Sequence, residues 1–114
     1  MADIKSDLVH KHCRPCQPGT PALSAQRVSE LLGALGGWGL ANGGIQKMFQ
    51  FKNYYETMAF VNAVAWVAHR EDHHPDLEVG YNKCTVRYST HSVGGLSEND
   101  FICAAKVDSL LANG

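Results

Sequence analysis

The sequence lacks a strong charge of either sign and a long apolar run. Its 10 Lys and Arg residues nearly balance its 11 Asp and Glu residues, giving a formal net charge of −1. No overall positive field therefore favours nucleic acid or an anionic membrane surface. The most apolar stretch, Met58–Ala68, is about half as long as the ~20 residues that a membrane-crossing helix needs. We expect no direct nucleic-acid contact and no membrane insertion.

The N-terminal residues also lack the apolar core of a signal peptide. Met1–Leu8 contains three charged side chains, Asp3, Lys5 and Asp7, which makes the cytoplasm the expected location. In that reducing compartment the four cysteines are expected to be free thiols. With 45% hydrophobic and 18% charged residues in 114, the chain has the composition of one globular domain.

Residues 1–21 show no helical or strand periodicity and contain three of the four prolines. We interpret them as an irregular N-terminal arm, followed by a single domain over residues 22–114. In this domain, Ser24 is a good N-cap for a helix that ends at the Gly36-Gly37 pair. Asn53 likewise caps a second helix that ends near Asp72.

Alternating residues predict two hairpins. The first spans Trp38–Phe51 with its turn at Asn42–Gly44, and the second joins Val79–Tyr81 to Cys84–Ser89. A third helix follows Ser97, with Asp100 placed as in a capping box. The expected fold is α+β, a single four-stranded antiparallel sheet with three helices packed on one face. Its exposed edges favour a homodimer or homotetramer.

The one unusual count is six histidines. His73 and His74 are adjacent at a helix end that Pro75 terminates, and His91 follows a strand that could return beside them. Imidazoles titrate near pH 6.5, so one can act as an acid while another acts as a base. Two other interpretations stay open. His69 and His73 have the spacing of two ligands in a zinc site. Alternatively, His73 and His74 simply supply favourable charge at a helix C-terminus.

From Trp38 to the C-terminus the sequence resembles the pterin-4a-carbinolamine dehydratase family. The matching segments are Gly37-Trp38, Phe49–Tyr54, Phe60–Ala68, His73–Asp76, Tyr81–Lys83, Ser89–His91 and Gly94–Asp100. The resemblance implies a hydro-lyase that converts 4a-hydroxytetrahydropterin to quinonoid dihydropterin and water, with no metal or organic cofactor. It also implies functional coupling to an aromatic amino acid hydroxylase, whose tetrahydropterin is thereby recycled.

The resemblance assigns roles to individual residues. His73 and His91 become the acid and base, in an order that the sequence leaves open. His74 completes the catalytic trio and is expected to hold the pterin, together with Asp72, Ser89 and Thr90.

Other positions have two interpretations each. Trp38 and Asp100 match family positions near the substrate, although a core tryptophan and a helix cap explain them equally well. His69 replaces the glutamate that many members carry, which alters the environment of His73.

The arm contains the segment His10–Cys16, HKHCRPC, whose imidazoles and thiols are ligands that zinc accepts. A single C-x-x-C is a weak signal, so we interpret the arm as a flexible lead-in without metal. A different function class remains as an alternative. Animal members of the family also serve as dimerisation partners of a transcription factor, so this chain could be a regulatory protein-binding partner that influences transcription.

Overall fold

The computed structural model describes residues 4–17 and 19–111. The remaining parts of the expected arm and domain, residues 1–3, 18 and 112–114, lie outside the described residues. The elements in chain order are α1 (Ile4–His10), α2 (Ala25–Leu35), β1 (Gly39–Ala41), β2 (Gly44–Gln50), α3 (Tyr54–Glu71), β3 (Asp76–Val79), β4 (Lys83–Tyr88), the 3-10 helix η1 (His91–Val93) and α4 (Glu98–Ser109).

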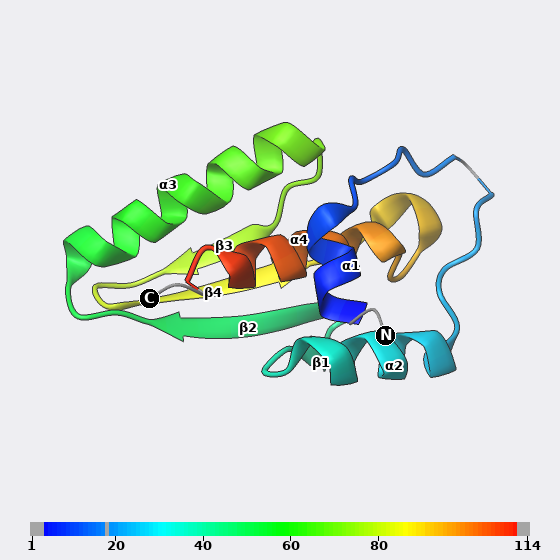
Figure 1. Cartoon of the computed structure of the whole chain (residues 1–114), viewed down its shortest axis with the longest axis horizontal. Coiled ribbons are helices and arrows are strands. Elements are labelled where there is room, and N and C mark those ends of the chain that lie inside the picture. Colours follow the sequence, from blue (N-terminus) through cyan, green and yellow to red (C-terminus); the bar gives the residue numbers. More distant parts are fainter. Residues whose placement is uncertain (1–3, 18, 112–114) are drawn as a thin grey trace.

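The strands form one antiparallel sheet in the order β1-β2-β4-β3. The α+β class and the four-stranded sheet are therefore confirmed. Both predicted caps are present: the side chains of Ser24 and Asn53 accept from backbone N–H groups in the first turns of α2 and α3. Figure 1 shows α3 running lengthwise beside the strands and α4 lying over β4.

Alternation along β2 and β4 determines which face of the sheet is covered. Ile45 and Phe49 on β2, with Val86 and Tyr88 on β4, are buried against the helices. The intervening residues on the other face, such as Met48, are partly or fully exposed. Phe60 of α3 completes this core, with its ring centroid 4.8 Å from that of Phe49.

The arm is not irregular throughout, which corrects the expected count of three helices. Residues 4–10 form α1, which lies across α4 (Figure 1) and buries Leu8. This covering explains why α4 is buried on nearly all sides, including its polar residues Asn99, Asp100 and Asp108, since a helix packed between a sheet and another helix has little surface facing water. With seven residues, α1 is too short to give a clear periodic signal.

The second hairpin also differs from the expected boundaries. β3 comprises Asp76–Val79 and β4 comprises Lys83–Tyr88, so Tyr81 belongs to the turn and Ser89 follows the strand. Leu77 lies opposite Val86 in the register and packs against the core. The strand therefore begins immediately after Pro75, earlier than its β-rich residues suggested.

Candidate active site

The C-terminus of α3 places two histidines at the edge of the sheet. Asp72 adopts the left-handed conformation (φ 52°) and its N–H donates to the Ala68 carbonyl. Among non-glycine residues, Asp and Asn tolerate this conformation best. The chain consequently turns out of the helix at this residue, and Pro75 prevents any return to helix. His73 and His74 are thus presented beside β3.

The residues that follow β4 lie opposite this end of α3. Ser89, Thr90 and His91 follow the strand, and Thr90 pairs with Gly95 through N–H···O bonds of 3.0 and 3.4 Å. Gly94 has φ 67°, a conformation that glycine adopts without steric cost. This closed loop carries His91 back toward the end of α3.

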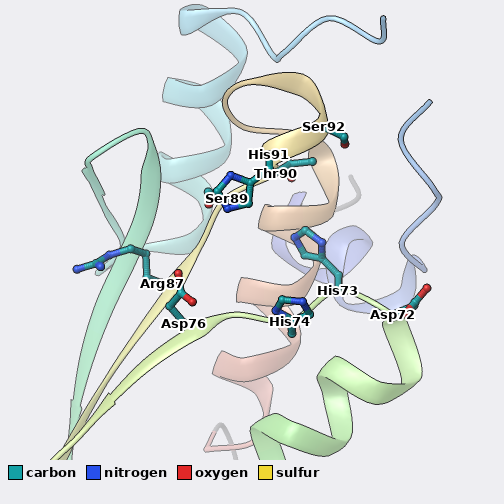
Figure 2. A pocket seen from close by; sticks show the side chains of 9 residues that line it. All are labelled: Asp72, His73, His74, Asp76, Arg87, Ser89, Thr90, His91 and Ser92. Atoms are coloured by element: carbon teal, nitrogen blue, oxygen red, sulfur yellow. The ribbon is translucent and has the colours of Figure 1, made fainter. Parts of the chain in front are cut away.

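A cavity of about 220 Å³ lies between these two segments. Figure 2 shows the side chains around it, with all three predicted histidines present. The lining residues are Asp72, His73, His74, Asp76, Arg87, Ser89, Thr90, His91 and Ser92. The structure therefore brings together the six lining residues predicted from the histidine pattern or the resemblance, Asp72, His73, His74, Ser89, Thr90 and His91, and adds Asp76 from a matching family segment.

Asp100 contacts His73 from behind the cavity. The His73 Nε2 atom lies 2.7 Å from Asp100 Oδ1, and the Asp100 side chain is fully buried. The other oxygen, Oδ2, accepts from Thr90 Oγ1 at 2.8 Å and from the Ser97 amide at 3.0 Å. A carboxylate can only accept, so Nε2 carries the proton in this bond and Nδ1 is the ring nitrogen left for a ligand.

Tyr88 packs against the same imidazole. Its ring is stacked on that of His73, with centroids 5.7 Å apart and planes at 10°. Tyr88 is fully buried, and burial raises the pKa of its phenol. The imidazole is thus held both by a charged acceptor and by an aromatic plane, which fixes its orientation before any ligand binds.

Two of the expected substrate-binding residues lie elsewhere. Trp38 is buried in the core, where its Nε1 donates to Asp108 at 3.1 Å and its ring meets Phe49 edge-on. Asp100 contacts His73 rather than the cavity, while it also binds the N-cap amide as the capping box predicted. Neither Trp38 nor Asp100 is among the residues that line the cavity.

His69 does not join the cluster. Its ring lies against the exposed indole of Trp66, with centroids 5.6 Å apart, and it is absent from the residues that line the cavity. The helical spacing to His73 predicted a shared site, but α3 ends at Glu71, before His73, and the two imidazoles contact different partners, Trp66 and Asp100.

Arg87 and Ser92 also line the cavity, although neither was predicted from the sequence. Arg87 lies opposite Gln46 and Asp76 in the sheet register, and its guanidinium donates to Gln46 Oε1 at 2.8 and 3.1 Å. The alternation of Thr85, Arg87 and Ser89 was the available signal, because Arg87 shares its face with a residue already assigned to the site. Ser92 carries no such signal.

The zinc-type side chains of the arm bind separate partners. His10 Nδ1 contacts the Ser6 carbonyl, His12 Nδ1 contacts Glu71, and the Cys13 thiol contacts Cys103. The hydrogen bond with Cys103 and, to a smaller extent, burial raise the pKa of the Cys13 thiol. A raised pKa disfavours the thiolate, which is the form that binds metals. Across residues 4–17 and 19–111, no group of three His, Cys, Asp or Glu side chains is placed to hold a metal ion.

The described residues also contain no helix long and apolar enough to cross a membrane.

Comparison with known proteins places this chain in a family. The sequence profile described as Pterin 4 alpha carbinolamine dehydratase matches residues 21–110. A relative from Nitrosospira multiformis, provisionally named pterin-4-alpha-carbinolamine dehydratase, is 62% identical over 91% of this chain and 92% of its own length. A second, from Stenotrophomonas maltophilia and with the same provisional name, is 55% identical over 96% of both chains.

Two solved structures share the fold of this chain. A crystal structure of a transcriptional coactivator/pterin dehydratase from Brucella melitensis has a TM-score of 0.75 and 32% identity, covering 78% of this chain and 97% of that one. A pterin dehydratase-like protein described as a RuBisCO assembly factor in the alpha-carboxysome shares the fold, with a TM-score of 0.57 and 24% identity over 66% of this chain and 89% of its own. The profile match and the close relatives support dehydratase activity, and the chain belongs to the pterin-4a-carbinolamine dehydratase family.

Proposed function

We propose that this protein dehydrates 4a-hydroxytetrahydropterin to quinonoid dihydropterin by histidine general acid/base catalysis. In the reaction the C4a–O bond breaks, the hydroxyl leaves as water after gaining a proton, and the N5–H proton is removed as the C4a=N5 double bond forms. One acid and one base at opposite ends of this unit are sufficient. His73 and His91 are the proposed pair, and the catalytic step needs no other group.

The observation that supports this proposal most strongly is the His73–Asp100 contact of 2.7 Å. Because Nε2 is bonded to a buried carboxylate, a single tautomer is favoured and Nδ1 is the nitrogen that exchanges a proton with substrate. Such preorganisation is typical of catalytic imidazoles, since acid/base catalysis requires a ring held in hydrogen-bond reach of the reacting atom.

The cavity suits a small heterocycle. Its volume of about 220 Å³ is below the ~300–1,000 Å³ typical of drug-sized ligands, and a fused two-ring pterin is a ligand of that smaller class. His74, Asp72, Ser89 and Thr90 offer donors and acceptors at its wall. We propose that these side chains bind the polar edge of the pterin, and that Arg87 and Asp76 extend this polar wall along the sheet.

Stopped-flow kinetics tests the proposal. Carbinolamine generated by an aromatic amino acid hydroxylase decays spontaneously, so the wild-type protein must accelerate the decay in proportion to its concentration. His74→Ala is expected to raise KM more than it lowers kcat, because the role of His74 is to hold the ring. A decay rate unchanged by stoichiometric protein would refute the dehydratase proposal.

The cellular role that we propose is recycling of the tetrahydropterin of such a hydroxylase in the cytoplasm. A regulatory, protein-binding role is the second candidate, and one observation favours it: the related Brucella protein is described as a transcriptional coactivator as well as a pterin dehydratase. With a net charge of −1, this role would use protein contacts rather than direct contact with DNA.

A further inference from the structure

The arm residues that follow α1 lie against the last turn of α3. The carboxylate of Glu71, the final residue of α3, accepts from the Cys13 amide at 2.7 Å and contacts His12 Nδ1 at 3.0 Å. Lys106 of α4 lies 3.8 Å away from the same carboxylate. The Glu71 side chain is only 4% exposed. A buried carboxylate is costly unless it is paired, and the arm supplies most of these partners.

The same arm segment also binds the first turn of α4. Asn99 Oδ1 accepts from the Arg14 amide at 3.0 Å, and Asn99 Nδ2 donates to the Arg14 carbonyl at 2.6 Å. This two-point contact uses both sides of one amide, so it fixes the position of the arm backbone. Asn99 directly precedes Asp100, the residue that holds His73.

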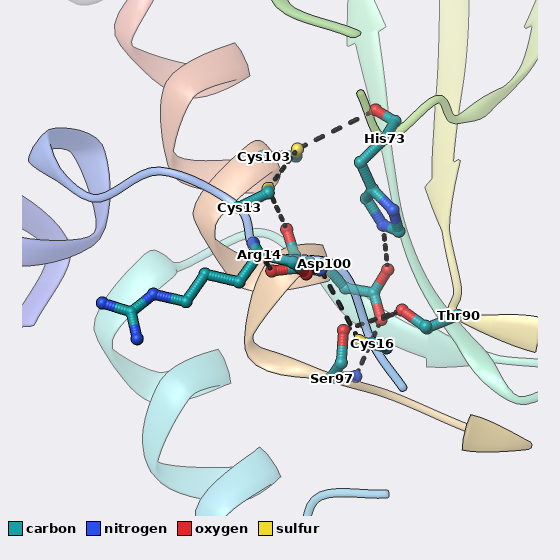
Figure 3. Close-up of polar contacts among 9 residues, drawn as sticks. Cys13, Arg14, Cys16, His73, Thr90, Ser97, Asp100 and Cys103 are labelled. Carbon is teal, nitrogen blue, oxygen red and sulfur yellow. Dashed lines mark hydrogen bonds and ion pairs between the residues drawn. The ribbon is translucent and has the colours of Figure 1, made fainter. Parts of the chain in front are cut away.

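A third connection runs through sulfur. The Cys13 and Cys103 Sγ atoms are 3.5 Å apart, and Cys103 Sγ lies 3.9 Å from the His73 carbonyl oxygen. Figure 3 shows these contacts beside the His73–Asp100 bond. Thiols are weak donors, so we assign this connection to packing around His73 rather than to a strong bond.

These contacts close a ring of interactions. The arm joins the end of α3 to the start of α4 on one side, and His73 joins the same two elements through Asp100 on the other. A second cavity, of about 260 Å³, lies between the two sides; its lining includes Cys13, Arg14, His73 and Thr90. Only Asp72 separates Glu71 from His73, which couples the backbone position of Glu71 to that of His73.

We propose that the arm segment His12–Cys16, acting through Glu71 and Asn99, is a positioning part of the active site that fixes the His73–Asp100 pair. The inference rests on the proposed function, because it assigns these residues a role in the same reaction. Glu71 and Asn99 do not reach the substrate cavity and are positioning residues. A displacement of a catalytic group by ~1 Å can cost about 100-fold in rate.

The first test compares three single variants by stopped-flow kinetics. Glu71→Ala is expected to lower kcat by about 10- to 100-fold and to change KM by a smaller factor, because Ser89 and Thr90 bind the substrate from the β4 side of the cavity. Glu71→Gln keeps an acceptor for the Cys13 amide and is expected to recover part of that loss. Glu98→Gln is the matched control, since Glu98 pairs with Lys11 of the arm at 3.1 Å on the exposed surface, and it should leave kcat unchanged.

A double-mutant cycle separates positioning from general destabilisation. In a His73→Ala background, Glu71→Ala should cause no further loss of kcat, because its effect passes through the missing imidazole. An equal loss in both backgrounds would overturn the inference, as would wild-type kcat in a folded Glu71→Ala protein. If Glu71→Ala fails to fold, Asn99→Ala and Glu71→Gln are put through the same cycle.

A readout independent of activity keeps the two proposals apart. The Nε2 proton of His73, bonded to Asp100, is expected as a slowly exchanging downfield NMR resonance in the wild type and as a broadened or absent one in Glu71→Ala. Persistence of the resonance in that variant contradicts the positioning role. If the wild type shows the resonance but no dehydration, the proposed function fails while the arm's effect on His73 is still measured.

Discussion

Asp100 performs two tasks with one carboxylate. One oxygen holds the imidazole of His73, and the other closes the N-terminus of α4 through Ser97 and fixes Thr90. From the sequence, a helix cap and a site residue were equally good interpretations of this position, and the structure shows the capping bond together with a contact to His73. A side chain with three partners and no exposed surface has little freedom to move, so it holds the imidazole of His73 in one orientation.

Asp100→Asn separates the charge of this carboxylate from its shape. The variant retains one acceptor but cannot accept at both ends, because the amide nitrogen only donates. We expect kcat to fall at least ~10-fold, since the favoured His73 tautomer loses its charged partner. Loss of buried hydrogen bonds should also cost about 1–3 kcal/mol of stability. Stopped-flow kinetics and urea unfolding measure the two effects, and unchanged kcat would contradict the assigned role.

Tyr88 offers a contrasting prediction. Within the described part of the chain, its hydroxyl is buried without a hydrogen-bond partner, whereas its ring stacks on His73. Burying a hydroxyl without a hydrogen-bond partner is unfavourable. Tyr88→Phe should therefore leave the free energy of unfolding unchanged or raise it by up to about 1 kcal/mol, and it should keep kcat. Thermal and urea unfolding check this; a loss of more than about 1 kcal/mol would mean that the hydroxyl is satisfied.

Among the elements, the site depends on how α3 ends and α4 begins, and the arm contacts both, through Glu71 at the end of α3 and Asn99 at the start of α4. Burial acts to raise the pKa of Glu71, but the Cys13 amide, His12 and Lys106 outweigh it, and the pKa lies below its ordinary value of 4.5. A carboxyl whose folded-state pKa is depressed adds stability above its unfolded pKa. That stability is lost as the pH falls through the folded value.

Glu71→Gln should therefore flatten the acid limb of the stability curve. At pH 7 the wild type is expected to be the more stable protein, and the difference should shrink below the ordinary pKa of 4.5 and disappear once Glu71 is protonated in the folded state. Urea unfolding from pH 7 to pH 3 measures this difference. An equal difference at both ends of that range would show that the charge of Glu71 does not stabilise the docked arm.

The elements with strong local signals could be predicted from the sequence. Ser24 and Asn53 marked helix starts because capping is a contact within one turn, and His73-His74-Pro75 marked a helix end because proline blocks continuation. Helix α1, a seven-residue helix with only Leu8 buried, and the start of β3 could not be predicted. In both cases the deciding contacts come from residues distant in the chain.

The same distinction applies to the site. The three histidines and their neighbours could be predicted because a family pattern fixes their spacing. The contact between His73 and Asp100, the withdrawal of Trp38 into the core and the docking of the arm on Glu71 could not, since each depends on packing between separate elements. Arg87 could have been added from strand alternation alone.

In the molecule as far as residues 4–17 and 19–111 describe it, one sheet face and the edges at β1 and β3 are free of the helices that cover the other face. Exposed large side chains also lie on α3, among them Tyr55 and Trp66, at 82% and 61% exposure. Self-association as a homodimer or homotetramer therefore remains our proposal. Sedimentation equilibrium should give the mass of a homodimer or homotetramer of the 12.4 kDa chain. A single-chain mass at micromolar concentration would contradict the proposal.

Histidine acid/base catalysis is tested most directly by the stopped-flow rate of carbinolamine dehydration by the wild type, His73→Ala and His91→Ala, each verified as folded by circular dichroism. We predict that the wild type accelerates the reaction and that each variant loses about 100- to 10,000-fold of that acceleration, the contribution of acid/base catalysis. Wild-type rates in both variants would contradict the assignment of His73 and His91 as the catalytic pair.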